Sequence, residues 1–131
     1  MLDYKKILLV DDDEDDRQVF AQILHEINPH ITLETAENGL EMAALLDKTV
    51  ETELPDLIIL DQNMPKMTGK ESLVFIKESP RYKKIVTILY STYQVKDFYR
   101  ECLDLGAKDV VAKPDTMQSY RDMIESFLAT E

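Results

Sequence analysis

The sequence predicts a doubly wound α/β sandwich, in which helices cover both faces of a parallel sheet. Two short apolar runs, residues 6–10 and 57–60, have the length and β-branched content of strands that are buried on both faces. Segments with the apolar spacing of helices alternate with strand-like runs, so that five strands and five helices are predicted along the chain. The length of 131 residues is close to the commonest size of a single domain.

The first strand, residues 6–10, runs directly into the acidic residues 11–16. Residues 13–16 suit the cap and first turn of a helix, where negative charge meets the positive end of the helix dipole. This helix ends at Asn28 and Pro29, and its apolar face consists of Val19, Phe20, Ile23, Leu24 and Ile27. Residues 31–36 alternate apolar and polar side chains, which predicts a strand at the edge of the sheet.

The middle of the chain is built around the second buried strand. After a turn at residues 37–39, a second helix is predicted from the apolar residues Leu40, Ala43, Ala44 and Leu45 or Leu46. A polar connection, residues 48–54, leads into strand 57–60, which stops at Asp61. Pro65 forces a turn before the third helix, which starts after Gly69, runs to about residue 79 and has Leu73, Val74 and Ile76 as apolar residues.

Two strands and two helices complete the predicted sandwich. Residues 85–90 form the fourth strand and residues 109–112 the fifth. The helix between them ends at Gly106 and carries on one face Val95, Phe98, Tyr99 and Cys102. The last helix has one apolar face, formed by Tyr120, Met123, Ile124, Phe127 and Leu128.

The amino-acid composition indicates which classes of protein the chain can belong to. With 44% hydrophobic and 31% charged residues, the chain is typical of soluble globular domains, and without a long apolar run or signal peptide we expect it in the cytoplasm. The net charge of −11 opposes binding to nucleic acid and to anionic membranes. The single cysteine, Cys102, excludes an internal disulfide and a multi-cysteine metal site, and is expected to be a small buried residue of a helix.

Polar side chains follow four of the predicted strands. They are Asp11 and Asp12, Asp61, Ser91 and Thr92, and Lys113. Because ligands bind beyond the carboxyl ends of parallel strands, we expect these groups to share one site. Close carboxylates repel one another unless a cation lies beside them, and Mg²⁺ is the small divalent cation that accepts a few carboxylates and keeps its waters.

This set of side chains suits phosphoryl transfer. The reaction needs an in-line nucleophile and positive charge on the equatorial oxygens. Asp61 can be the nucleophile, Mg²⁺ and Lys113 can bind the oxygens, and the Ser91 hydroxyl can donate a hydrogen bond to one of them. The formal charges of three aspartates, one lysine and one Mg²⁺ sum to zero, so the site can accept an incoming anion.

Asp11-Asp12, Asp61 in LDQNMPKMTG, Ser91 and Lys113-Pro114 resemble the receiver domain of bacterial two-component response regulators. The resemblance extends from about residue 5 to residue 127 and implies a flavodoxin-like sheet with strand order 2-1-3-4-5 and five helices. It implies that Asp61 accepts a phosphoryl group from a histidine kinase or a phosphotransfer protein. It further implies that Asp12, Asp61 and the Asn63 carbonyl ligate Mg²⁺, that Asp11 acts partly through water, and that Ser91 and Lys113 bind the phosphoryl oxygens.

One position departs from the family pattern. Receivers usually have an aromatic residue three positions before the lysine, and this side chain reorients on phosphorylation, but here the position is Val110. Tyr90 and Tyr93 flank Ser91 and are the candidates to replace that ring. Tyr93 is also a candidate to cover the phosphoryl group and hinder the attacking water.

The few residues that follow the last predicted helix, together with the negative net charge, indicate how the chain is expected to work. Residues 1–131 are expected to form a single receiver domain without an effector domain, which signals by protein contact through its fourth helix, fifth strand and fifth helix. Such a domain is not an enzyme acting on other substrates, because it catalyses only its own phosphorylation and dephosphorylation.

Three other interpretations of the acidic residues fit the sequence less well than a receiver domain. A hydrolase of the haloacid dehalogenase type would use Asp11 as nucleophile with Asp13 as its partner, but the residues that follow do not fit that pattern. An EF-hand starting at Asp11 has Asp16 where glycine is required and Gln22 where glutamate is required. A degenerate receiver acting as a scaffold conflicts with the intact set of site residues. His25 and His30 are predicted to be ordinary helix and loop residues.

Overall fold

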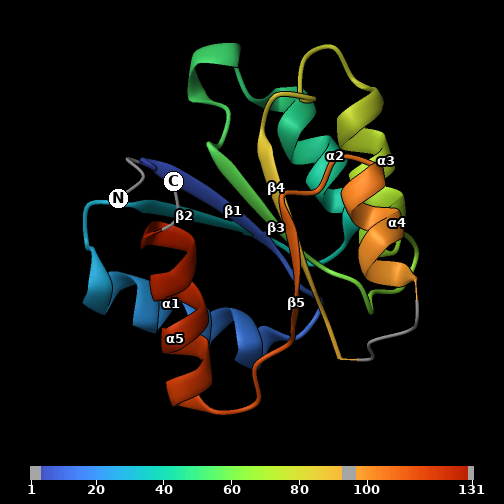
Figure 1. Cartoon of the computed structure of the whole chain (residues 1–131). Helices are drawn as coiled ribbons and strands as arrows, with labels where there is room; N and C mark the ends of the chain where they lie inside the picture. Colours follow the sequence, from blue (N-terminus) through green and yellow to red (C-terminus); the bar gives the residue numbers. More distant parts are fainter. Residues whose placement is uncertain (1–3, 93–96, 130–131) are drawn as a thin grey trace.

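The computed structural model describes residues 4–92 and 97–129 (Figure 1). The strands are β1 (Lys6–Val10), β2 (Thr32–Ala36), β3 (Leu57–Asp61), β4 (Val86–Ser91) and β5 (Asp109–Ala112). The helices are α1 (Glu14–Ile27), α2 (Gly39–Lys48), α3 (Gly69–Glu78), α4 (Phe98–Asp104) and α5 (Met117–Ala129). A short 3₁₀ turn, Glu51–Glu53, interrupts the polar connection before β3.

The five strands form one parallel sheet in the order β2-β1-β3-β4-β5, which confirms the expected topology. Helices α1 and α5 cover one face of the sheet, and α2, α3 and α4 cover the other (Figure 1). The central strand β3 is buried along its whole length, as its continuous apolar sequence predicts.

The core is divided by the sheet into two layers. Alternate strand residues point to opposite faces, so Ile7, Ile59 and Tyr90 pack with α1 and α5, while Leu8, Ile58 and Val110 pack with the other three helices. All five residues predicted for the apolar face of the last helix are buried. The alternation along β4 and β5 decides which residues can meet at the site described below.

Two helices differ from their predicted faces. In α2 the buried residues are Gly39, Met42 and Leu46, whereas Leu40 is 57% exposed. Helix α2 starts at Gly39, so Met42 and Leu46 form an i, i+4 pair toward the sheet and Leu40 points away from it. In α4, Cys102 is buried as expected, but Tyr99 is 48% exposed, and Val95 lies outside the described residues.

The turn after α4 requires glycine. Gly106 has a φ of 112°, a conformation that other residues rarely adopt. A side chain there would also press on the aliphatic part of Lys77, whose ammonium group donates to the carbonyls of Lys83 and Ile85. The two hydrogen bonds of Lys77 hold the end of α3 against the segment that leads into β4.

None of the helices in the described part of the chain has the length and apolar character needed to span a bilayer.

Candidate functional site

The carboxyl ends of the central strands bring three carboxylates together. Asp11 follows β1, Asp61 ends β3, and Asp12 lies beside them, so that one oxygen from each carboxylate lies within 4.8 Å of the others. Asp11 and Asp61 are buried, whereas Asp12 is exposed. The predicted grouping of these three residues is therefore present in the structure.

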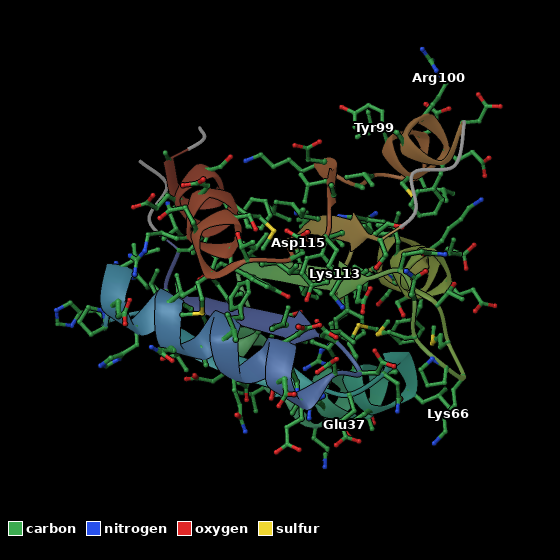
Figure 2. The ribbon with its side chains drawn as sticks, turned by 90° about the horizontal axis from the view of Figure 1, so that it is seen from below. Glu37, Lys66, Tyr99, Arg100, Lys113 and Asp115 are labelled. Atoms are coloured by element: carbon green, nitrogen blue, oxygen red, sulfur yellow. The ribbon has the colours of Figure 1, made fainter. Side chains whose placement is uncertain are left out.

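Lys113 reaches this group from the end of β5 (Figure 2). Its ammonium nitrogen lies 3.0 Å from Asp61 Oδ2, 3.5 Å from Asp11 Oδ2 and 2.9 Å from a third partner, Asp16 Oδ2. Burial would lower the pKa of Lys113, but the hydrogen bond to Asp16 and the charges of Asp11 and Asp61 outweigh burial, so the pKa is raised. Lys113 is thus a permanent cation at the centre of the site.

Asp61 is held in a low-dielectric position and is only 1% exposed. Its Oδ1 accepts a hydrogen bond from the backbone N–H of Asn63 at 3.1 Å, and its Oδ2 accepts one from Lys113. Burial and then the charge of Asp11 raise the pKa of Asp61 to about 6, although Lys113 and the Asn63 N–H act in the opposite direction. Additional positive charge beside this carboxylate would favour its ionised form.

The loop after β3 is fixed by backbone contacts. The N–H of Gln62 donates to the carbonyl of Tyr90 at 2.9 Å, and the Gln62 side chain accepts from the N–H of Lys70 at 2.7 Å. A Cβ atom on Gly69 would lie 2.7 Å from the Asp61 carbonyl oxygen, so this close approach requires glycine. Thr68 then caps α3 reciprocally with Glu71. These contacts fix the backbone that directly follows Asp61.

The acidic residues that follow β1 have different roles in the structure. The carboxylate of Asp13 accepts from the N–H groups of Asp15 and Asp16 and caps α1, as predicted. The N–H of Asp13 donates to Asp11 Oδ1 at 3.0 Å, and Arg17 donates to the Asp11 carbonyl at 2.7 Å. Helix α1 begins at Glu14, inside the segment that an EF-hand loop would need, so the structure contains no such loop there.

Ser91 ends β4, and its side chain lies on the face of the sheet that also carries Val110. Val110 is buried in that layer, so the position usually held by a mobile aromatic ring is filled by a small side chain. The suggestion that Tyr90 replaces this ring is wrong. Tyr90 packs in the α1 and α5 layer, on the opposite face of the sheet, because successive residues of a strand alternate. Tyr93 lies outside the described residues.

Two site residues were not predicted from the sequence. Asp16 was assigned only to the first turn of α1, yet its carboxylate binds Lys113. Tyr90 was placed beside Ser91, yet its hydroxyl donates a hydrogen bond to Asp11 Oδ2. For Asp16, the sequence holds a signal that was missed: it lies on the first turn of α1 directly after the strand-end aspartates. For Tyr90, the alternation along β4 would have pointed its side chain away from Ser91.

The arrangement also bears on the hydrolase interpretation. Asp11 is 0% exposed, and both of its oxygens accept hydrogen bonds, from the Asp13 N–H and from Tyr90. Asp61 is also buried, but it ends the central strand and one of its oxygens accepts a hydrogen bond from the cationic Lys113, so Asp61 fits the part of the attacking carboxylate better than Asp11 does.

Known proteins share this fold and sequence pattern. Residues 7–125 match the family model of the response regulator receiver domain. The chemotaxis protein CheY1 of Helicobacter pylori is 30% identical over 125 residues, which cover 95% of this chain and 98% of that protein. The two-component response regulator ORR13 of Oryza sativa subsp. japonica is 33% identical over 108 residues, covering 82% of this chain and 85% of that protein.

Solved structures of response regulators have the same fold as this chain. The phosphorylated cyanobacterial phytochrome response regulator RcpA superposes with a TM-score of 0.85 at 30% identity, covering 98% of this chain and 96% of that one. The Mn²⁺-bound form of response regulator Rcp1 superposes with a TM-score of 0.84 at 28% identity, covering 97% of this chain and 96% of that one. With its five-stranded sheet and its strand-end aspartates, the chain belongs to the response regulator receiver domain family, whose members are phosphoacceptors in two-component signalling.

Proposed function

We propose that Asp61 is the residue of this receiver domain that accepts the phosphoryl group. The observation that carries the proposal is the position of Asp61 at the end of the central strand, with Lys113 3.0 Å from one of its oxygens and Asp11 and Asp12 beside it. Attack by an Asp61 oxygen forms the acyl phosphate bond as the bond between phosphorus and the donor breaks.

Mg²⁺ fits the carboxylate group. Asp11, Asp12 and Asp61 offer three hard oxygen ligands within 4.8 Å of one another, and the exposure of Asp12 leaves room for the waters that Mg²⁺ retains. We assign Asp12, Asp61 and the Asn63 backbone carbonyl as direct ligands, and Asp11 as a partner acting partly through water. Bound Mg²⁺ would neutralise the charge of the transferring group and leave Asp61 ionised.

Lys113 and Ser91 complete the site on the protein's side. The ammonium group of Lys113 already contacts Asp61, so it needs little reorganisation to bind an oxygen of the phosphoryl group. Ser91 lies on the neighbouring strand end, where its hydroxyl can donate a charge-assisted hydrogen bond to another oxygen. The domain then catalyses its own phosphorylation and dephosphorylation.

We further propose that the phosphodonor is a histidine kinase or a phosphotransfer protein, and that residues 1–131 act as one domain through protein contact. The output surface consists of α4, β5 and α5. It carries the exposed side chains of Tyr99 and Met117, and a groove of about 430 Å³ lies between β5 and α5 beside Lys113. Tyr99 and Arg100 point outward from α4 (Figure 2). The acidic net charge of −11 disfavours nucleic acid as the partner.

Incubation with acetyl phosphate tests this function. With Mg²⁺ present, intact-mass measurement should show one added phosphoryl group per chain that persists after the donor is removed, and chelation of Mg²⁺ should prevent it. Continuous release of phosphate without a retained group would indicate a hydrolase. No addition at all, under conditions that label a known receiver, would indicate a scaffold.

A further inference from the structure

Tyr90 is the largest fully buried side chain in the described part of the chain, and it links two strands of the site. Its backbone lies opposite Asp61 in the β3–β4 ladder. Its side chain crosses the α1 and α5 face of β3, and its hydroxyl donates a hydrogen bond to Asp11 Oδ2 at the end of β1. Tyr90 therefore contacts Asp11 through its side chain and pairs with Asp61 through its backbone.

The hydrogen bond completes the environment of Asp11. The Asp13 N–H holds one Asp11 oxygen at 3.0 Å, and Tyr90 holds the other. Lys113 also lies 3.5 Å from that second oxygen, and its ammonium nitrogen is 5.3 Å from the centre of the Tyr90 ring. With both oxygens bonded, the plane of the Asp11 carboxylate is fixed, and the ammonium group rests over the aromatic face.

A phenol in this place has a specific consequence. A buried hydroxyl needs a partner, and a buried carboxylate oxygen left without one carries a large desolvation cost, so each group satisfies the other. Phenylalanine would fill the same space but leave Asp11 Oδ2 with only Lys113 beside it. The Asp11 carboxylate would then lose one of the two hydrogen bonds that fix its plane, and it could turn out of the orientation that it holds beside Asp12 and Asp61.

We propose that Tyr90 is a positioning residue for the metal site: its hydroxyl orients Asp11 toward the cation bound by Asp12 and Asp61. The inference rests on the proposed Mg²⁺ site and adds a residue to it that does not touch the metal. Hydrogen-bond partners of metal-binding groups typically contribute about tenfold or more to metal affinity.

Tyr120 provides a matched control. It is also a buried tyrosine of the α1 and α5 layer, 4% exposed, and its hydroxyl lies near Asp16 and makes no hydrogen bond to Asp11, Asp12 or Asp61. Replacing either tyrosine with phenylalanine removes one buried hydroxyl and keeps the ring. Only Tyr90→Phe removes a hydrogen bond to Asp11.

Calorimetric titration with Mg²⁺ tests the proposal on the unphosphorylated chain. Tyr90→Phe should weaken Mg²⁺ binding about tenfold relative to the parent, whereas Tyr120→Phe should leave the affinity within about twofold. Far-ultraviolet circular dichroism establishes that each variant is folded at the titration temperature.

A spectroscopic measurement separates positioning from general stability. The chain has no tryptophan, so its near-ultraviolet absorbance reports mainly on its tyrosines. Mg²⁺ should perturb the phenol bonded to Asp11, giving a difference spectrum in the parent and in Tyr120→Phe that is lost in Tyr90→Phe.

Each outcome decides a different claim. Equal Mg²⁺ affinity in the parent and Tyr90→Phe, or a difference spectrum that survives in Tyr90→Phe, would overturn the role of Tyr90. Failure of the parent itself to bind Mg²⁺ would overturn the proposed metal site instead.

Discussion

Neutralising Asp61 should stabilise the metal-free protein. The site places three buried or partly buried carboxylates around one ammonium group, at 2.9 Å, 3.0 Å and 3.5 Å. Asp61 is almost fully buried, and its pKa is raised from 3.8 to about 6. The folded protein therefore holds a proton on Asp61 more tightly than the unfolded chain does, and ionisation of Asp61 opposes folding.

The size and sign of the effect follow from that shift. Each pKa unit corresponds to about 1.4 kcal/mol, so a shift from 3.8 to about 6 makes the ionised Asp61 cost about 3 kcal/mol of unfolding free energy at about pH 8. The stability associated with the protonated form is fully present below about pH 4 and is lost as the pH rises through about 6. Asparagine has nearly the same shape as aspartate but carries no charge. The unfolding free energy of Asp61→Asn should therefore exceed that of the parent by about 3 kcal/mol at about pH 8 and by less than about 1 kcal/mol at about pH 4.

Urea denaturation with a chelator present measures this difference at both pH values. Asp104→Asn, at an exposed position of α4, is the control for removing one negative charge from an acidic chain. Saturating Mg²⁺ should reduce the advantage of Asp61→Asn, because the cation stabilises the ionised parent by mass action. An Asp61→Asn variant that is less stable than the parent at the higher pH without metal would refute this account of the electrostatics.

Three further substitutions test other parts of the site. Asp12→Ala should weaken Mg²⁺ binding at least tenfold in calorimetry, because an anionic ligand is lost; unchanged affinity would place the metal elsewhere. Gly69→Ala should lower the unfolding free energy by about 1–3 kcal/mol, because the new Cβ would clash with the Asp61 carbonyl oxygen. A variant as stable as the parent in urea denaturation would mean that the loop can shift to make room for the methyl group without cost. Lys113→Met should lower the unfolding free energy of the metal-free protein by about 3–5 kcal/mol, and Mg²⁺ should restore part of that stability. Lys108→Met, at an exposed position, is the control. If Lys113→Met loses no more stability than Lys108→Met, the ammonium group does not hold the carboxylates together.

Periodicity and strand-end chemistry were sufficient to predict much of the molecule. The continuous apolar runs located β1 and β3, and the spacing of Tyr120 to Leu128 located the buried face of α5, because in these segments burial alone decides which residues are apolar. The grouping of Asp11, Asp12 and Asp61 followed from the rule that the carboxyl ends of parallel strands meet at one edge.

The remaining features depend on contacts that local patterns do not encode. Helix α2 contains more apolar residues than one face can bury, so its rotation depends on where Gly39 packs against Met67 and Ser72 of the neighbouring segment. The first turn of α1 places Asp16 near the strand-end aspartates, but its contact with Lys113 depends on how the fold brings together two residues that are far apart in sequence. Tyr90 was placed beside Ser91 by sequence proximity, although strand alternation puts the two side chains on opposite faces.

Chemical localisation of the phosphoryl group tests the central claim most directly. After labelling with acetyl phosphate and Mg²⁺, borohydride reduction converts a phosphorylated aspartate to homoserine, and peptide mass spectrometry then identifies its position. We predict homoserine at residue 61, with no labelling of Asp61→Asn. Homoserine at Asp11, Asp12 or Asp13, or an Asp61→Asn variant that is labelled as fully as the parent, would contradict the account.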